Sequence, residues 1–222
     1  MVERRKALSA AAGARTATEQ APPPMGRRER NKQEKLARIV QAARVLFGEK
    51  GFAETTTQQI AEAADIGTGT LFLYARSKED LLVMVFKDEM IETARAAFEQ
   101  LREGDPLLDQ LVQLFSSMMG YHARDPDLAR ILLKEIMFPA APDRAADITE
   151  LLQFIYGELG ELVTDAQKSG DFRPGADPIL VAENLFANYY MDLMAWLGGG
   201  ISMQQFPDRL RQHLAITISA GR

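Results

Sequence analysis

The sequence contains no cysteine and only two histidines, His122 and His213, among its 222 residues. The absence of cysteine excludes disulfide bonds, thiolate metal sites and cysteine nucleophiles. Two histidines that stand so far apart disfavour a histidine-based metal centre, and no acid–base pair stands beside a matching nucleophile. We therefore expect no metal, no cofactor and no catalytic activity, and a helical enzyme is the weakest interpretation of the chain.

Long uncharged hydrophobic stretches are also missing. No apolar run approaches the roughly 18 residues that a membrane-spanning helix needs. Arg4, Arg5 and Lys6 stand near the N-terminus, but the apolar segment of a signal peptide does not follow them. We expect a cytoplasmic protein that does not enter a membrane.

Charge is distributed unevenly along the chain, although its net value is only −5. Residues 1–86 carry 14 Lys and Arg against 10 Asp and Glu, whereas residues 87–222 carry 12 against 21. A basic front part on an acidic body indicates that the front part alone meets an anionic partner. Nucleic acid is one such partner, although a basic tail without a function gives the same pattern.

The first residues differ in composition from everything that follows. Residues 1–26 are rich in Ala, Thr, Arg and Pro, show no sustained apolar periodicity and contain three consecutive prolines at 22–24. We therefore predict a disordered basic arm over residues 1–28. A helix follows, because apolar residues recur every three or four positions up to Phe47, and Gly51 ends it.

Two short helices joined by a tight turn are predicted next. Thr56 is placed to cap the first of them, and Gln59 stands where a capping box requires Glu or Gln. The turn ends at Gly67, since glycine adopts backbone conformations that are costly for other residues. The second short helix covers 68–74, and Ser77 then caps a long helix. This pattern is typical of a helix-turn-helix.

The rest of the chain is a succession of helices separated by Gly, Pro and Asp. Apolar residues at helical spacing predict helices over 78–102, 106–122, 126–137, 144–168, 178–197 and 207–219. No segment alternates apolar and polar residues as a strand would. We predict an all-α protein of about nine helices, in which a three-helix domain with the helix-turn-helix covers 29–76 and a larger helical domain covers 77–222.

A helix-turn-helix reads DNA because its second helix fits the major groove and contacts bases through its first residues. Here those residues are Thr68, Gly69 and Thr70. A threonine offers a hydroxyl and a methyl group, and a glycine lets the backbone approach a base edge. Leu71 is expected to face inward and to hold the second helix against the first.

Short motifs follow one another through this part of the chain. They are AARVLF at 42–47, KGF at 50–52, TT at 55–56, IA at 60–61, AA at 63–64, GTLF at 69–72, Tyr74, SKE at 77–79 and LL at 81–82. In this order and spacing, residues 29–82 resemble the DNA-binding domain of the TetR/AcrR family. The resemblance implies a transcriptional regulator whose larger domain binds an effector and forms the dimer.

The resemblance also implies DNA contacts by position. They are Thr56 for phosphate, Thr68, Gly69 and Thr70 for bases, and Phe72, Leu73, Tyr74 and Lys78 for the DNA backbone. Independently of the resemblance, we expect Arg28 in the basic arm to add a phosphate or minor-groove contact. Two of these residues have simpler alternatives, because Tyr74 can serve domain packing and Lys78 can be a solvated first-turn residue. Asp65, Phe72 and Ala75 depart from the family's usual glycine, tyrosine and large aromatic, so the operator sequence is not predicted.

For the larger domain the resemblance implies an effector cavity and a dimer interface. We predict the cavity lining from methionine and aromatic residues and one histidine, namely Met90, Phe115, Met119, His122, Phe138, Phe154, Tyr189 and Met194. We predict the dimer interface from the apolar faces of the last two helices, namely Leu185, Tyr189, Leu193, Trp196, Leu210 and Leu214. The alternative in both cases is that these side chains complete the monomer core, with His122 at a helix end near solvent.

Together these observations predict a sequence-specific DNA-binding transcriptional regulator, acting as a repressor that a small, largely apolar ligand releases from its operator. A homodimer would bind a near-palindromic operator in double-stranded DNA, because its two reading helices enter successive major grooves about 34–36 Å apart. The alternative is a DNA-binding architectural protein of the same fold that has no effector.

Overall fold

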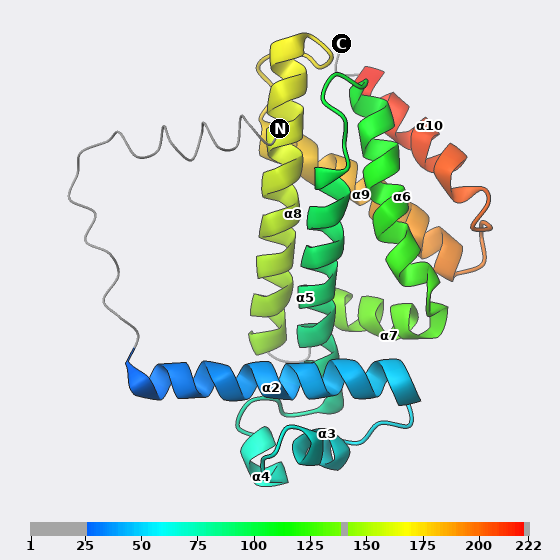
Figure 1. The fold of residues 1–222 in the computed structure, drawn as a ribbon. Helices are drawn as coiled ribbons and strands as arrows, with labels where there is room; N and C mark the ends of the chain where they lie inside the picture. The colour runs from blue at the N-terminus through cyan, green and yellow to red at the C-terminus, as the bar shows by residue number, and fades with distance from the viewer. Residues whose placement is uncertain (1–25, 139–141, 220–222) are drawn as a thin grey trace. The chain divides into compact units, whose positions relative to one another are not determined.

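The structure is a computed structural model that describes residues 26–138 and 142–219. The chain divides into two compact units, residues 1–37 and residues 38–222. The described part of the first unit is the beginning of α2 (Arg27–Lys50). Within the described residues all regular structure is helical, in nine helices, which confirms the predicted all-α class (Figure 1).

The predicted arm over 1–28 lies outside the described residues except for its last three positions. Of these, Arg27 and Arg28 form the first turn of α2 rather than part of an arm, which corrects the prediction. The backbone N–H of Glu29 donates to the carbonyl of Gly26 at 3.0 Å and so closes this turn. The apolar pattern could not reveal these turns because their side chains are polar and exposed.

The helix-turn-helix consists of α3 (Thr57–Ala63) and α4 (Thr68–Leu71). α4 is shorter than the predicted 68–74. After its last residue, the N–H groups of Leu73 and Tyr74 donate to the carbonyls three residues back, at 3.1 and 2.8 Å. The chain therefore tightens into turns of the 3₁₀ type there, without continuing as an α-helix.

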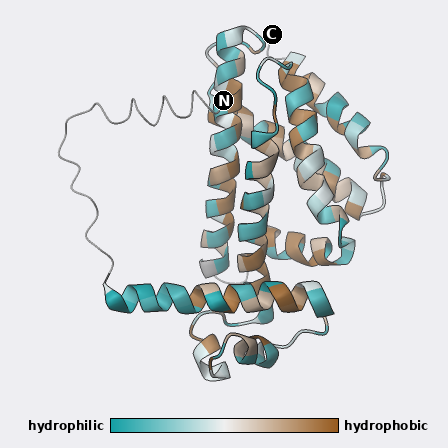
Figure 2. Cartoon of the chain, viewed as in Figure 1, coloured by the Kyte–Doolittle hydropathy of each residue, from teal (hydrophilic) through white to brown (hydrophobic). Residues whose placement is uncertain are grey.

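The second unit continues with six helices. They are α5 (Lys78–Glu99), α6 (Leu107–Ala123), α7 (Pro126–Met137), α8 (Pro142–Ser169), α9 (Pro178–Leu197) and α10 (Phe206–Ser219). α8 lies along α5 and packs on α9, α10 packs on α6 and α9, and α7 contacts α5, α6 and α9 (Figure 1). Hydrophobic and hydrophilic residues occupy different sides of these helices (Figure 2), as expected for helices that share a core.

Capping side chains set several helix starts within a few residues of the predicted positions. Ser77 Oγ accepts from the N–H of Asp80 at the start of α5, and Asp125 Oδ1 accepts from the N–H of Leu128 in α7. Asp177 does the same for α9, and a proline follows both Asp125 and Asp177 at the first helical position. Across residues 26–138 and 142–219, no helix combines the length and hydrophobicity that a membrane span requires.

Aromatic packing joins three helices in the core of the second unit. Phe115 on α6 and Tyr189 on α9 stack with ring centroids 5.0 Å apart, and Phe206 on α10 meets Tyr189 edge-on at 6.3 Å. All three side chains are fully buried. This packing fixes the position of the Tyr189 ring, and with it the direction of its hydroxyl group.

Candidate DNA-binding and ligand-binding sites

Side-chain hydrogen bonds fix the start of α3. Thr56 Oγ1 accepts from the N–H of Gln59 at 3.2 Å, and Gln59 Oε1 accepts from the N–H of Thr56 at 3.0 Å, so the predicted capping box is confirmed. The neighbouring Thr55 is buried, and its hydroxyl donates toward the carbonyls of Leu46 (3.1 Å) and Gly51 (2.8 Å). Thr55 therefore ties α2 to the segment before α3, a role that sequence reasoning missed.

The turn between α3 and α4 contains an aspartate in a conformation that glycine adopts more easily. Asp65 has a φ of 55°, and no other non-glycine residue in the described part has a positive φ. Its carboxylate is exposed and lies 4.0 Å from Arg38, which is a weak surface pair. The departure from the family pattern at this position therefore carries a conformational cost.

The first turn of α4 is open to an external partner. Gly69 is exposed, Thr68 and Thr70 are half-buried, and Leu71 is fully buried against the core of the domain. A Cβ atom at Gly69 would have no heavy atom within 4 Å, and its φ lies outside the positive range that favours glycine. The fold itself therefore does not require glycine at 69, whereas close approach of a DNA base edge would.

The residues after α4 extend this outward surface. Phe72 is 46% exposed and Leu73 is 84% exposed, while Tyr74 is half-buried. Large apolar side chains exposed side by side mark a contact surface more often than an ordinary solvent-facing turn. Phe72 offers no hydroxyl, so its contact with a partner would be apolar.

Lys78 is held in place by the protein itself. Its Nζ donates to the carbonyls of Phe52 (2.6 Å) and Ala53 (3.1 Å), and it lies 4.3 Å from the centre of the Phe52 ring. Two of its three N–H donors are therefore engaged. Lys78 therefore fixes the α2–α3 loop, and its contact with a DNA phosphate stays a prediction.

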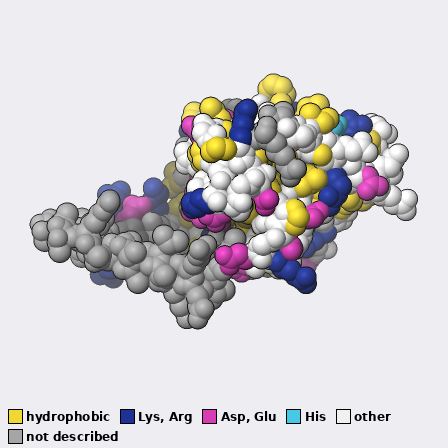
Figure 3. All heavy atoms as spheres, turned by 90° about the horizontal axis from the view of Figure 1, so that it is seen from above, with side chains coloured by type: hydrophobic (Ala, Val, Ile, Leu, Met, Phe, Trp, Pro, Cys, Tyr) yellow, Lys and Arg dark blue, Asp and Glu magenta, His cyan; other side chains and the backbone are white. Residues whose placement is uncertain are grey.

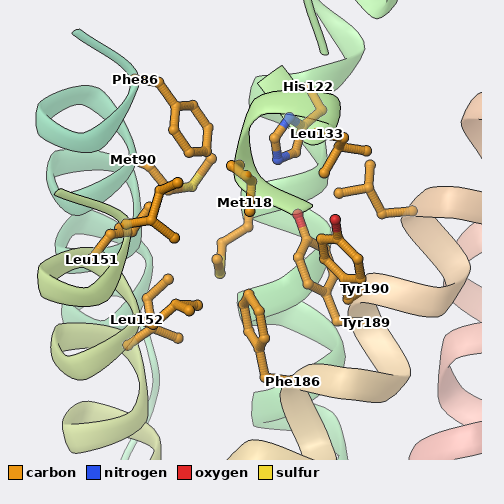
Figure 4. Close-up of a pocket in the computed structure, with 14 residues that line it drawn as sticks. Phe86, Met90, Met118, His122, Leu133, Leu151, Leu152, Phe186, Tyr189 and Tyr190 are labelled. Carbon is orange, nitrogen blue, oxygen red and sulfur yellow. The ribbon is translucent and has the colours of Figure 1, made fainter. Parts of the chain in front are cut away.

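A cavity of about 40 Å³ lies between α5, α6, α7, α8 and α9. The residues that line it are Phe86, Met90, Met118, His122, Leu133, Ile136, Ile148, Leu151, Leu152, Ile155, Phe186, Tyr189, Tyr190 and Leu193 (Figure 4). No charged residue is among them. Three of the eight predicted lining residues, Met90, His122 and Tyr189, are in this set.

The other five predicted lining residues are not part of the cavity lining, which corrects the prediction. Phe115 and Met119 are fully buried in the core, and Phe138 is 76% exposed. Phe154 lies under the guanidinium of Arg95, whose Cζ is 5.5 Å from its ring centre, and Met194 is 42% exposed. Sequence reasoning missed Phe186 and Tyr190, although the broad apolar surface of 178–197 includes both.

Three polar atoms interrupt the hydrocarbon lining. They are His122 Nδ1 and the hydroxyls of Tyr189 and Tyr190, and each is buried without a hydrogen-bond partner among the described residues. Burial lowers the pKa of His122 to about 4, so its imidazole is neutral at pH 7. Burial raises the pKa of both tyrosines above the ordinary value, so their hydroxyls keep their protons.

The predicted dimer residues are mostly internal. Leu185, Tyr189, Leu193, Leu210 and Leu214 are each at most 1% exposed within one chain, because they form the contact of α9 with α10 and the core. For these five residues the alternative prediction, that they complete the monomer core, describes the structure. Trp196 is half-buried.

A different set of apolar side chains on α9 and α10 faces outward. Leu180, Met191, Met194 and Ile216 are between 42% and 67% exposed. A groove of about 530 Å³ lies between Leu180 and Ile216 and is bounded by the α8–α9 connection. At the end of the second unit seen in Figure 3, by contrast, charged side chains of both signs are interspersed with hydrophobic ones where grey atoms do not cover them.

A buried ionic cluster connects the cavity walls to the start of α5. Arg144 on α8 donates from Nε to Asp80 and from Nη1 to Glu135 on α7. Asp80 also accepts from the N–H groups of Arg76 (2.7 Å) and Ser77 (3.1 Å), which join α4 to α5. Because α7 and α8 both line the cavity, the cluster places cavity and helix-turn-helix in one network of contacts.

A second network links α2 with the same region. Arg44 on α2 lies 3.5 Å from Glu89 on α5, whose carboxylate accepts from the hydroxyl of Tyr121 at 2.7 Å. The Tyr121 ring packs against Phe86 and His122, with centroids 5.9 and 5.5 Å away. Since Phe86 and His122 line the cavity, these contacts connect the cavity lining with α2.

Two protein-family models match this chain. A family model described as "Bacterial regulatory proteins, tetR family" matches residues 39–85, and one described as "Tetracyclin repressor-like, C-terminal domain" matches residues 106–191. The chain belongs to the TetR family. The first match covers the helix-turn-helix and the second covers most of the cavity lining, so this TetR-family protein is a DNA-binding transcriptional regulator.

Relatives of this TetR-family protein cover most of its length. The "Fatty acid metabolism regulator protein" of Bacillus subtilis (strain 168) is 25% identical over 168 residues, which are 76% of this chain and 86% of the relative. The "HTH-type transcriptional repressor KstR" of Rhodococcus jostii (strain RHA1) is 25% identical over 195 residues, 85% of each chain.

Solved structures share the fold. FadR of Thermus thermophilus, a TetR-family repressor in complex with lauroyl-CoA, has a TM-score of 0.67 and 26% identity, covering 82% of this chain and 92% of that one. FadR of Bacillus subtilis in complex with stearoyl-CoA has a TM-score of 0.61 and 23% identity, covering 84% and 99%; this second likeness shows the fold alone.

Proposed function

We propose that this TetR-family regulator is a cytoplasmic repressor that leaves its operator when a largely apolar ligand of the fatty acyl-CoA class enters the cavity of the second unit. The observation that carries the proposal is the cavity itself, which lies between five helices and has no charged residue in its lining. The Thermus thermophilus relative, whose complex contains lauroyl-CoA, supports the acyl-CoA class.

The DNA half of the proposal rests on the surface of α4. Thr68, Gly69 and Thr70 would read bases, and the exposed Phe72 and Leu73 together with Tyr74 would flank them on the DNA backbone. Thr56 accepts from Gln59 but keeps its own hydroxyl hydrogen for a phosphate, and Lys78 has one N–H left for the same purpose. Arg28, exposed in α2, would add a sequence-independent charge contact.

The small size of the cavity suggests how a ligand could release the protein from its operator. Its volume of about 40 Å³ is far below the roughly 150 Å³ of an engineered cavity that binds benzene. An acyl chain therefore binds only a form in which the walls have moved apart, and Met90 and Met118 can adapt to it. Because α7 and α8 are walls and Arg144 joins them to Asp80, the expanded form would reposition α4 and bind DNA less well.

We also propose that two copies assemble through α9 and α10. The support is the outward-facing apolar set Leu180, Met191, Met194 and Ile216, together with the groove between Leu180 and Ile216. An apolar surface of this kind on a monomer marks an interaction site. A two-fold dimer would present two copies of α4 to one face of the DNA, and its operator would be near-palindromic.

Binding and release can be measured on the full chain. Selection from random double-stranded DNA should return a near-palindromic site bound with a Kd of about 10⁻⁸ M or tighter. Saturating lauroyl-CoA should raise that Kd by at least about tenfold, the effect of roughly 1.4 kcal/mol of coupling. Coenzyme A without the acyl chain should leave it unchanged. If the selected DNA fragments share no common sequence, the proposal that the protein binds a specific operator is wrong.

Two matched variants separate the halves of the proposal. Thr68→Ala should weaken operator binding while lauroyl-CoA still binds, because Thr68 is not part of the cavity lining. Leu152→Trp should narrow the cavity from a half-buried position, so that operator binding persists and lauroyl-CoA no longer releases it. If no acyl-CoA or other apolar ligand alters operator binding of the unmodified chain, the protein is the architectural DNA-binding protein instead.

A further inference from the structure

We infer that the ligand of the cavity carries a neutral oxygen, a hydroxyl or a carbonyl, on its hydrocarbon body, and that His122, Tyr189 and Tyr190 bind this oxygen. The inference rests on the proposed function, since it requires that the cavity takes a ligand. It adds the chemical group that an apolar lining alone would not select.

The three side chains converge on one part of the cavity from two helices. His122 stands in the last turn of α6, and Tyr189 and Tyr190 stand side by side on α9. In Figure 4 both hydroxyls are directed toward the imidazole ring, while the remaining lining is hydrocarbon and thioether. His122 is 4% exposed and Tyr189 is 1% exposed, so bulk water does not reach either group.

These polar atoms have no hydrogen-bond partner in the part of the chain that the structure describes. His122 Nδ1 and both hydroxyls lack a hydrogen bond to any described residue. Buried polar groups in folded proteins are almost always hydrogen-bonded, because an unpaired group keeps the whole cost of losing its water. Phenylalanine and leucine would fill the same space without this cost. The presence of three polar groups is therefore best explained by a ligand that enters the cavity and forms hydrogen bonds with them.

The charge of the surroundings decides which oxygen fits. The lining contains no lysine or arginine to pair with a carboxylate, and an unpaired buried carboxylate is strongly unfavourable. His122 itself is neutral at pH 7, because burial lowers its pKa to about 4. A neutral imidazole and two phenols offer both donors and acceptors, which suits a hydroxyl, a ketone or a thioester carbonyl and disfavours a free fatty acid.

A buried water could satisfy the same three groups, since one water needs only about 10–15 Å³ and two to four polar partners. The two cases differ in what the hydroxyls do for the protein alone. If a permanent water binds them, removal of a hydroxyl breaks a structural network and lowers the melting temperature. If they serve a ligand, Tyr189→Phe leaves the melting temperature unchanged or raises it, because a buried unpaired hydroxyl is removed.

The test measures how the affinity of each probe depends on the oxygen that the probe carries and on the presence of each tyrosine hydroxyl. Affinities of 2-decanone, 1-decanol, sodium decanoate and lauroyl-CoA are measured by calorimetry for the full chain and for Tyr189→Phe, Tyr190→Phe and Tyr156→Phe. Tyr156 is the matched control, because its ring contacts Phe186 at 5.6 Å but it does not line the cavity. The ketone and the alcohol should bind the unmodified chain more tightly than decanoate.

The expected pattern is a loss of about threefold to tenfold for oxygen-bearing probes in Tyr189→Phe, the effect of one hydrogen bond, with Tyr156→Phe unchanged. Sensitivity confined to lauroyl-CoA assigns the oxygen to the thioester, and sensitivity of the ketone and alcohol assigns it to a group on a free ligand. Decanoate binding best, or every probe binding Tyr189→Phe and Tyr190→Phe as tightly as the unmodified chain, overturns the inference while the apolar ligand site stands. Failure of every probe to bind the unmodified chain refutes the proposed ligand site itself.

Discussion

Arg144 on α8 donates from Nε to the carboxylate of Asp80, which also completes the capping box of α5 with Ser77. Both side chains are buried, with Arg144 8% and Asp80 6% exposed. The pair thus joins a cavity wall to the first turn of the helix that follows the helix-turn-helix. Because both side chains are buried, removal of either one would leave the other charge buried without a partner, which lowers the stability of the fold.

Arg144→Met should lower the free energy of unfolding by about 3 kcal/mol, because the carboxylate of Asp80 stays buried without its partner. Urea titration of the full chain measures the loss. Lys168→Met is the control, since the pair of Lys168 with Asp165 is exposed and should contribute less than about 0.5 kcal/mol. If lauroyl-CoA still binds Arg144→Met, it should raise the operator Kd less than in the unmodified chain. Equal losses in the two variants would contradict this role of Arg144.

Asp65→Gly should stabilise the protein by roughly 0.5–1 kcal/mol, because glycine adopts the φ of 55° without strain. The lost ion pair with Arg38 is long and exposed, so it offsets little of this gain. Thermal unfolding checks the sign, and operator affinity should stay within about twofold. A lower melting temperature would show that the carboxylate has a role the structure does not reveal.

Gly69→Ala should fold normally yet bind the operator at least about tenfold more weakly, the effect of losing one close base contact. The structure leaves room for the methyl group, and helix propensity favours alanine. Gly51→Ala provides the contrast, because its φ of 80° makes alanine strained and the variant should lose stability instead. Circular dichroism and fluorescence anisotropy separate the two outcomes. Unchanged operator affinity in Gly69→Ala would remove this residue from the DNA contacts.

Lys78→Met should cost about 1–2 kcal/mol of stability, because the carbonyls of Phe52 and Ala53 lose their donor. The salt dependence of operator binding decides whether Lys78 also contacts phosphate. If it does, the slope of log Kd against log salt decreases by about one unit per subunit. An unchanged slope together with lower stability would assign Lys78 to the loop alone.

Stability should fall with acid in a window set by His122. Its pKa is lowered to about 4 in the folded protein, while the unfolded chain titrates near the ordinary value of 6.5. Between these values the unfolded state binds a proton that the folded state does not. Stability is therefore complete above about pH 6.5 and falls as the pH drops toward 4, by at most about 1.4 kcal/mol per pH unit. His122→Leu should flatten this decline, and urea titration at a series of pH values measures it.

Local signals explain how much of the fold could be predicted. Caps at Thr56, Ser77 and Asp125 depend on one side chain and the backbone a few residues away, so the sequence reveals them directly. An apolar pattern does not mark where a helix begins when its first side chains are polar, as in the first turns of α2. The helix-turn-helix could be predicted because its caps, its turn and its two short helices all lie within one short segment of the sequence.

Apolar side chains do not show from the sequence alone which neighbour they will meet. Leu210 and Leu214 have the pattern of an interface helix, yet they are fully buried within one chain, and Ile216 on the same helix faces outward. Phe115 and Tyr189 both belong to the core, but only Tyr189 also reaches the cavity. A hydrophobic side chain packs equally well into a core, a cavity wall or a partner, so its type does not distinguish them.

The sequence by itself determined the all-helical class, the helix-turn-helix and the family, because these follow from periodicity, caps and the order of short motifs. Only the tertiary structure decided that Arg144 reaches Asp80 and that His122, Tyr189 and Tyr190 share one cavity. These contacts join residues that are tens of positions apart. Their geometry depends on how the helices pack, and no local pattern of residues encodes that packing.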